Sequence, residues 1–225
     1  VNYTEIGNSN DWAGKANQGN SDIIMLGARG LKDPNNVYVE GWGFAPVTKA
    51  LNDAFLPNDP RKWTTIIDHE EFRAEGGTVS SDVNQYTGYS VRKYHPRAGY
   101  SSTVGTEALN YKNNYRVIRF SDVLLMASEA LLRSGGSVSE AQDYYARVVK
   151  RAMGDSYKVP AVSLENIYKE RRYEFAMEGI RYWDLVRTNQ AKDFIKGWDD
   201  TKKYLPIPQS EIDKSDGHLV QNPHF

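Results

Sequence analysis

The sequence predicts a mainly α fold in which a regular helical half is joined to a loop-rich half. From about residue 115 onward, apolar residues recur every three or four positions, which is the period of an amphipathic helix. Glycines interrupt this pattern at short intervals and predict tight connections between helices. Residues 1–114 are instead rich in Asn, Gly, Ser and Tyr, and turn signals recur between short apolar runs.

The first two predicted helices form an antiparallel pair. The first runs from about Tyr115 to Gly135-Gly136, and the second begins at Ser139 in a capping box with Gln142 and ends at Gly154. The stripe expected to be buried on the first helix comprises Val117, Phe120, Leu124, Ala127 and Leu131. The corresponding stripe on the second helix comprises Ala141, Tyr145, Val148 and Ala152.

A third helix is expected after Ser163, with a break near Gly179, and a shorter amphipathic segment then covers 180–187. The tail 204–208 is expected to be extended, because its two prolines forbid a helix. Helix starts about 24 residues apart predict helical hairpins of the tetratricopeptide kind. Such a stack needs about three or more units. Since this chain supplies fewer, we expect further helices to precede Val1.

The first half reads as loops with short strands and little helix. Strands are expected at 23–26 and 37–39, and one helix at 47–55, which Pro57 ends. A loop-rich stretch of this length is usually functional or supported by other chain segments. We therefore divide the chain into an irregular ligand-binding region, 1–114, and a helical region, 115–225, that together form one structural unit of a longer protein.

Composition excludes several classes of function. Lys and Arg total 28 against 29 Asp and Glu, so no electrostatic argument favours nucleic acid as a partner. The chain has no cysteine, which excludes disulfides and thiolate metal sites, and no apolar run long enough to span a membrane. The 15 Tyr and 5 Trp residues are the unusual feature, because such rings suit sugar faces and interfaces as well as cores.

No constellation of side chains qualifies as a catalytic or metal site, so we expect neither catalysis nor a cofactor. The segment at His69 lacks the second histidine of a metalloprotease motif and reads as solvated. Glu170, Glu174 and Glu178 share one helix face, as a glycosidase acid–base pair would require. Interleaved arginines lower a carboxyl pKa, however, and so favour a structural ion network. We predict this network to comprise Glu170, Arg171, Arg172, Glu174, Glu178 and Arg181.

Aromatic residues in the loops are the candidate ligand-binding residues. Trp42 stands between two glycines, which leaves its ring unshielded by neighbouring side chains. Trp12, Tyr86 and Tyr89 lie in other polar loops and are candidate members of the same platform, although ordinary packing is the alternative for each. Trp183 lies in the helical half, where we expect it to pack in the core.

Four segments of the second half resemble the SusD/RagB family. They are the helical segment 115–130, the segment 170–187 with Glu170-Arg171-Arg172 and Glu178-Gly179-Ile180-Arg181, the extended segment 205–208, and 221–223. The order and spacing of all four match, whereas the resemblance before residue 115 is looser. The family's lipidated cysteine and most of its helices would precede Val1.

The resemblance implies a non-catalytic lipoprotein of the bacterial outer membrane that displays glycans, or sometimes peptides, to a TonB-dependent transporter of the SusC type. Aromatic platforms and polar loop groups would bind the ligand at the cell surface. Two alternatives stay open from the residues alone. A helical-repeat adaptor for another protein would need a continuous concave face, and a glycoside hydrolase would need turnover that depends on a carboxylate.

Overall fold

The computed structural model describes residues 19–102 and 105–225, which form two compact units. The first unit ends at Met177 and the second comprises Glu178–Phe225. Trp12 lies outside the described residues. None of the described helices is both long enough and apolar enough to cross a membrane.

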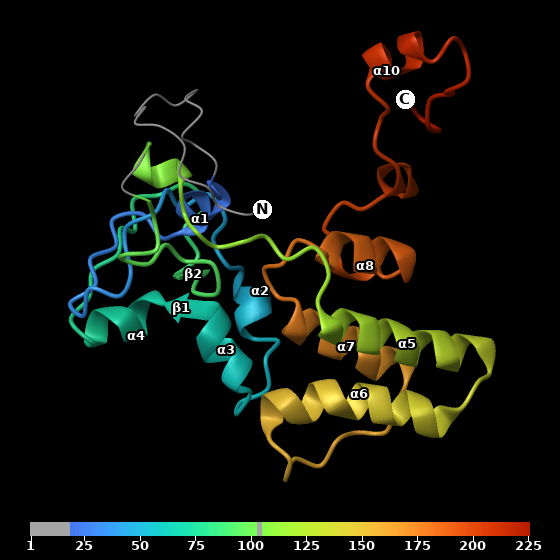
Figure 1. Ribbon diagram of the computed structural model, residues 1–225, viewed down its shortest axis with the longest axis horizontal. Coiled ribbons are helices and arrows are strands. Elements are labelled where there is room, and N and C mark those ends of the chain that lie inside the picture. The colour runs from blue at the N-terminus through green and yellow to red at the C-terminus, as the bar shows by residue number, and fades with distance from the viewer. Residues whose placement is uncertain (1–18, 103–104) are drawn as a thin grey trace. The chain divides into compact units, whose positions relative to one another are not determined.

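Helices dominate the described residues, which confirms the predicted fold class (Figure 1). The α-helices of the first unit are α1 (Asp22–Leu26), α2 (Lys49–Asn52), α3 (Pro60–Thr65), α4 (His69–Ala74), α5 (Phe120–Ser134), α6 (Val138–Met153) and α7 (Leu164–Glu174). Its strands are β1 (Ile66–Asp68) and β2 (Tyr89–Val91). The second unit contains α8 (Arg181–Arg187), α9 (Ala191–Phe194) and α10 (Gln209–Lys214).

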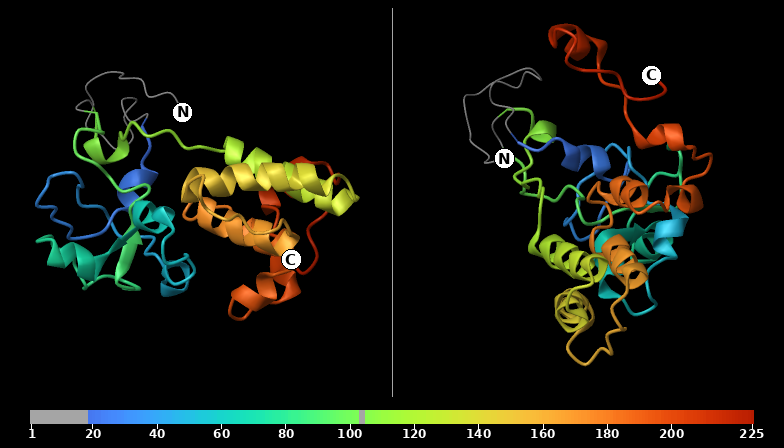
Figure 2. Two further views of the ribbon diagram at one scale, coloured as in Figure 1. Left: turned by 90° about the horizontal axis from the view of Figure 1, so that it is seen from below. Right: turned by 90° about the vertical axis from the view of Figure 1, so that its right-hand side faces the viewer.

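α5, α6 and α7 form the helical layer of the first unit and lie side by side in Figures 1 and 2. α5 ends as predicted, because Gly135 adopts a left-handed conformation at φ 71° and the Gly136 N–H donates to the carbonyl of Leu131. The start of α6 differs from the prediction. Ser137, not Ser139, caps it by accepting from the Glu140 N–H at 3.2 Å, so the helix begins two residues earlier than predicted.

The buried face of α5 is also rotated from the predicted stripe. Leu124, Leu125 and Ser128 are buried, whereas Val117 is 76% exposed and Phe120 is 63% exposed. The Ser128 hydroxyl donates to the Ala141 carbonyl at 2.7 Å and so joins α5 to α6 at their point of contact. A helical period alone does not say which of two apolar faces is covered, and here only one of them meets α6 and α7.

In the loop-rich region, a two-stranded antiparallel sheet separates two small cores. Ile66 pairs with Val91 and packs with Val47 and Phe55 on one face. Ile67 pairs with Ser90 and packs on the other face with Ala28, Leu31, Phe72 and Val79. Because successive strand residues point to opposite faces, two strands of three residues are enough to divide these cores.

Two predictions for the first half need correction. Residues 22–26 form helix α1 rather than a strand, since a short apolar run does not distinguish the two. Residues 37–39 contribute only an isolated bridge between Tyr38 and Arg97. The helix expected at 47–55 shortens to α2, although Val47 and Phe55 are buried on its two sides.

The second unit holds its extended tail by side-chain amides. Gln221 accepts from the Ile207 N–H at 2.8 Å and donates to its carbonyl at 2.9 Å, and Asn222 donates to the Leu205 carbonyl at 2.7 Å. These side-chain amides thereby satisfy backbone groups of a segment whose prolines exclude a helix. Trp183 is half exposed and meets Tyr182 edge to face, so its predicted core packing is wrong within this chain.

Candidate functional site

The predicted glutamates Glu170 and Glu174 are buried in the first unit, but most of their partners come from other elements. Glu174 accepts from Arg119 of the α5 N-terminus at 2.9 Å, from Arg151 of α6 at 2.6 Å, and from Arg61 of α3 at 3.2 Å. Arg61 also bonds Glu170 and forms a pair of hydrogen bonds with the buried Asp59. Three carboxylates thus face three guanidinium groups where α3, α5, α6 and α7 meet.

The other members of the predicted network behave differently. Arg171 pairs with Asp122 of α5 at 2.6 Å, and Arg172 donates to the carbonyl of Ala50 at 2.9 Å. The reason is geometric, because adjacent residues on a helix point about 100° apart and do not face each other. Glu178 and Arg181 belong to the second unit, where Glu178 is buried.

The electrostatics of this cluster suit a structural role. The arginines around Glu174, aided by Ser121, outweigh its burial and lower its pKa to about 2. Burial raises the pKa of Glu170 despite the Arg61 guanidinium, so the expectation that arginines would lower both values holds only for Glu174. Neither carboxyl is placed to exchange a proton with a substrate, because both are buried and bonded to guanidinium groups.

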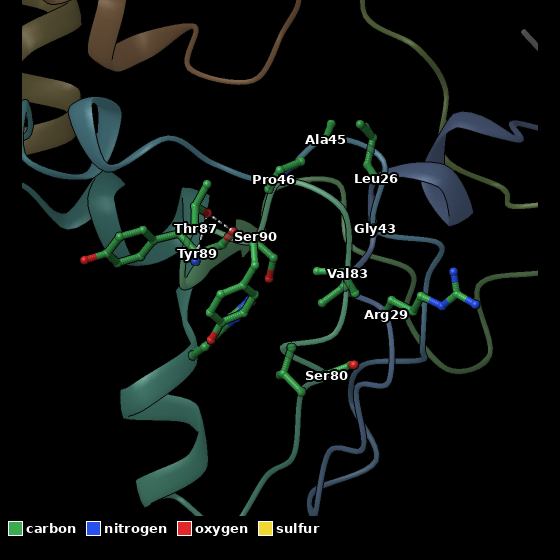
Figure 3. A pocket seen from close by; sticks show the side chains of 14 residues that line it. Leu26, Arg29, Gly43, Ala45, Pro46, Ser80, Val83, Thr87, Tyr89 and Ser90 are labelled. Atoms are coloured by element: carbon green, nitrogen blue, oxygen red, sulfur yellow. Dashed lines mark hydrogen bonds between the residues drawn. The ribbon is translucent and has the colours of Figure 1, made fainter.

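A pocket in the loop-rich region is the second candidate site (Figure 3). Its walls come from the end of α1, from the chain following Trp42, and from the loop that leads into β2. Backbone and hydroxyl groups fix these walls to one another, since the Val47 N–H donates to the Tyr89 carbonyl at 3.2 Å and the Thr87 hydroxyl donates to the Val47 carbonyl at 2.7 Å. The lining includes Leu26, Arg29, Gly43, Pro46, His69, Val83, Tyr86 and Ser90.

The Trp42 segment runs against the end of α1. The N–H groups of residues 41–44 donate to carbonyls of residues 24–28 at 2.8–2.9 Å. The two glycines serve this close approach, because a Cβ on Gly41 would lie 2.4 Å from the Gly27 Cα, and Gly43 has φ +76°. Trp42 itself is half buried, packs on Ile23 and Ile24, and meets Phe44 edge to face at 5.9 Å. The two glycines therefore allow the close backbone approach at Trp42, and they do not leave its indole ring fully exposed.

The pocket is lined by the segments that carry three of the four predicted binding residues, of which Tyr89 lies in β2 rather than in a loop. Tyr86 is 39% exposed and lines the pocket, and Tyr89 lines it while also packing on the core around Val47. The chain directly after Trp42 forms another wall, although the indole packs elsewhere. These residues stay predicted members of a binding site.

Sequence reasoning missed the two polar groups at the pocket floor. His69, expected in a solvated segment, is buried beside Tyr86 with ring centroids 5.5 Å apart, and Ser90 is buried with it. A signal existed in the alternation of β2, where Ser90 shares the face of the buried Ile67. Within 19–102 and 105–225, no group of three or more acidic or His side chains is placed to hold a metal ion.

Comparison with known proteins assigns the family. The sequence model of the SusD family (SusD_RagB) matches residues 68–225. The chain belongs to the SusD family. A curated relative, SusD-like protein P2 of Formosa agariphila, is 24% identical in a match that covers 89% of this chain and 44% of that protein. The chain therefore spans about half the length of the relatives it matches.

Several solved structures are similar over all or nearly all of the chain. A laminarin-binding SusD-like protein has a TM-score of 0.84 and 35% identity, covering 100% of this chain and 48% of that one. A second structure is surface glycan-binding protein A from Bacteroides thetaiotaomicron in complex with laminarihexaose. It has a TM-score of 0.80 and 33% identity, and the match covers 98% of this chain and 50% of that chain. The same-named protein from Bacteroides fluxus has a TM-score of 0.82 and 32% identity.

Proposed function

We propose that this chain is part of a non-catalytic cell-surface receptor that binds glycans and delivers them to a SusC-like TonB-dependent transporter. The observation that supports the ligand class best is the similarity to two SusD-like structures described as binding laminarin or holding laminarihexaose, each at 33% identity or more. Laminarin-type glucans are therefore the first ligands to test.

The described side chains suit a neutral oligosaccharide. A sugar ring presents an apolar C–H face and a rim of hydroxyls, which an exposed aromatic ring and nearby polar groups complement. Tyr86 supplies a partly exposed ring at the pocket, and Trp42 with the exposed Phe44 forms an aromatic pair beside the chain that lines it. We propose that Trp42, Tyr86 and Tyr89 contribute to the glycan platform, with Trp12 as a further member.

The state of the two buried carboxylates supports the proposal that the protein is not a hydrolase. Glycoside hydrolysis needs a pair of carboxyl groups, one of which is protonated and able to reach the glycosidic oxygen. Glu174 is held ionised by its arginines, and Glu170 is buried and bonded to Arg61. We propose that both serve the fold alone, and that the protein releases no sugars from the glycan it binds.

An uncovered face of α5 supports a larger assembly. Val117, Phe120, Val123 and Met126 recur every three residues along α5 and the chain before it, and all four are exposed. An apolar stripe of this kind is typical of an interface. We propose that helices of the same full-length protein, preceding Val1, cover it, and that a lipid anchor in that part holds the receptor at the outer membrane.

The test is a titration of the full-length protein with laminarihexaose by isothermal calorimetry, together with a reducing-end assay on the same mixture. We expect saturable binding and no increase in reducing ends. Sustained release of reducing ends that stops on substitution of Glu170 would replace the receptor by a hydrolase.

A further inference from the structure

The pocket beneath Tyr86 contains two buried polar side chains that have no hydrogen-bond partner among the described residues. They are His69, whose Nδ1 and Nε2 are both unpaired, and Ser90, whose Oγ is unpaired. The two residues are only 4% and 5% exposed, respectively. Buried polar groups in folded proteins are nearly always satisfied, so unpaired ones on the wall of a pocket point to a group that enters from outside.

The short sheet and the helix that follows it place these two side chains in one pocket. Ser90 of β2 lies opposite Ile67 of β1, and His69 begins α4 directly after β1; both residues line the pocket. The Gly88 carbonyl accepts from the His69 N–H at 3.0 Å and holds the start of α4 against the loop into β2. The arrangement of His69 and Ser90 is therefore set by backbone pairing and does not depend on a ligand.

The pocket is small, and an aromatic ring forms part of its lining. Its free volume is about 20 Å³, and a single water-sized group needs about 10–15 Å³. Tyr86 lines it, is partly exposed, and its hydroxyl accepts from the Arg73 guanidinium at 3.2 Å, which keeps the ring in place over His69. A ligand lying on Tyr86 would have one substituent within reach of the pocket.

The chemistry of the floor matches a hydroxyl group. A neutral imidazole offers one donor and one acceptor, and a serine hydroxyl offers both, so together they complement a group that also donates and accepts. Burial is the main cause of a lowered pKa for His69, to about 4, and the ring is therefore uncharged at neutral pH. Arg73 disfavours its protonation and Asp68 favours it, and Arg29 lies on the wall of the pocket. Arg29 is the one charged side chain among the residues that line the pocket, and a neutral hydroxyl enters without the loss of hydration that a carboxylate or ammonium would suffer.

We propose that His69 and Ser90 form a subsite that receives one hydroxyl or hydroxymethyl group of the sugar bound over Tyr86. This inference rests on the proposed glycan-binding function and adds to it a specific polar contact beneath the aromatic surface. The sugar hydroxyl would supply the hydrogen-bond partner that these two side chains do not find among the described residues. A bound water molecule held by the same two residues is the competing occupant.

The experiment compares Ser90→Ala and His69→Phe with the native full-length protein by calorimetric titration with laminarihexaose and by thermal melting. Ser134→Ala, an exposed serine at the end of α5, is the matched control. We expect each pocket variant to bind about 5- to 10-fold more weakly, as for loss of one hydrogen bond. We also expect its melting temperature to be unchanged or higher, because an unpaired buried polar group has been removed. The control should match the native protein in both measurements.

Two results would overturn the subsite. The first is native affinity in both pocket variants, which would refute the subsite and leave the proposed function intact. The second is a crystal structure with laminarihexaose in which a water molecule alone contacts Ser90. A sugar oxygen within hydrogen-bond distance of His69 or Ser90 would support it. If the native protein bound no laminarihexaose, the proposed ligand class and the subsite would both fall.

Discussion

Replacement of Glu174 tests how the helical layer is joined to the loop-rich region. This carboxylate accepts from Arg61, Arg119 and Arg151, which lie on three different elements, and is only 3% exposed. Truncation to Ala removes the carboxylate that these three guanidinium groups share, while Arg61 keeps its bonds to Glu170 and Asp59. Removing one partner of a buried ion pair costs about 3–5 kcal/mol.

The pKa of Glu174 gives an independent magnitude. It falls from 4.5 to about 2, and at about 1.4 kcal/mol per pH unit this corresponds to about 3 kcal/mol of stability at neutral pH. Because the folded-state pKa is the lower one, this contribution is fully present above pH 4.5 and is lost as the pH falls toward 2. Arg151 is more exposed than the other partners, and salt therefore weakens its share.

The assay is urea unfolding of the full-length protein between pH 7 and pH 3, with Glu174→Gln as the variant that preserves side-chain shape. We expect the variant to unfold at lower urea at pH 7 and its difference from the native protein to shrink as the pH falls below 4.5. Glu165→Gln on the same helix is the control, because its pair with Lys169 at 2.6 Å is exposed to solvent and should contribute little. A difference that stays constant with pH, or lost glycan binding at unchanged stability, would refute the structural role.

Three further predictions concern the loop-rich region. Trp42→Ala should weaken laminarihexaose binding at least 5-fold with the fold intact by circular dichroism. Trp63→Ala, which removes an exposed indole on α3, should not weaken binding. Equal affinity of the two variants would remove Trp42 from the site. Gly41→Ala should lower the melting temperature, because its Cβ would meet the Gly27 backbone at 2.4 Å, and a native melting curve would contradict that close approach. The buried His95 accepts from the Ala28 N–H at 3.0 Å, and its other ring nitrogen donates to the Pro96 carbonyl. This pair of bonds requires a neutral imidazole, and burial lowers the pKa of His95 from 6.5 to about 4. Stability should therefore be full above pH 6.5 and fall by up to about 3 kcal/mol toward pH 4, less so in His95→Gln, as followed by urea unfolding.

Local patterns in the second half predicted much of its structure. Gly135 and Gly154 end α5 and α6, and Ser163 caps α7 by accepting from the Asn166 N–H at 3.1 Å. The extended segment 204–208 was also predicted correctly, because proline removes the helical alternative regardless of tertiary contacts. Such signals succeed because they depend on the conformational limits of one or two residues.

Features that depend on distant contacts could not be read in the same way. The partner of Glu170 is Arg61, which lies 109 residues earlier in the chain, and no spacing rule connects them. By its sequence pattern, the apolar stripe through Phe120 is as suited to burial as the face that contains Leu125. Only the position of α6 decides which of the two faces is covered. The binding site stays the least predictable part, because aromatic residues in loops do not reveal which loops converge.

The pocket illustrates the same limit at a finer scale. Polar residues flanking His69 made its segment look solvated, yet its side chain is buried in the pocket that Ser90 also lines. Recognising that pair from sequence would have required the pairing of residues 66–68 with 89–91, about twenty residues apart. Register of this kind is set by tertiary packing on both faces of the sheet.

The titration of the full-length protein with laminarihexaose tests the central claim most directly. The receptor function predicts saturable heat of binding with one well-defined affinity and an unchanged glycan recovered at the end. The absence of binding to laminarihexaose would contradict the proposed ligand class, and recovery of shortened glycan would contradict the proposed absence of catalysis.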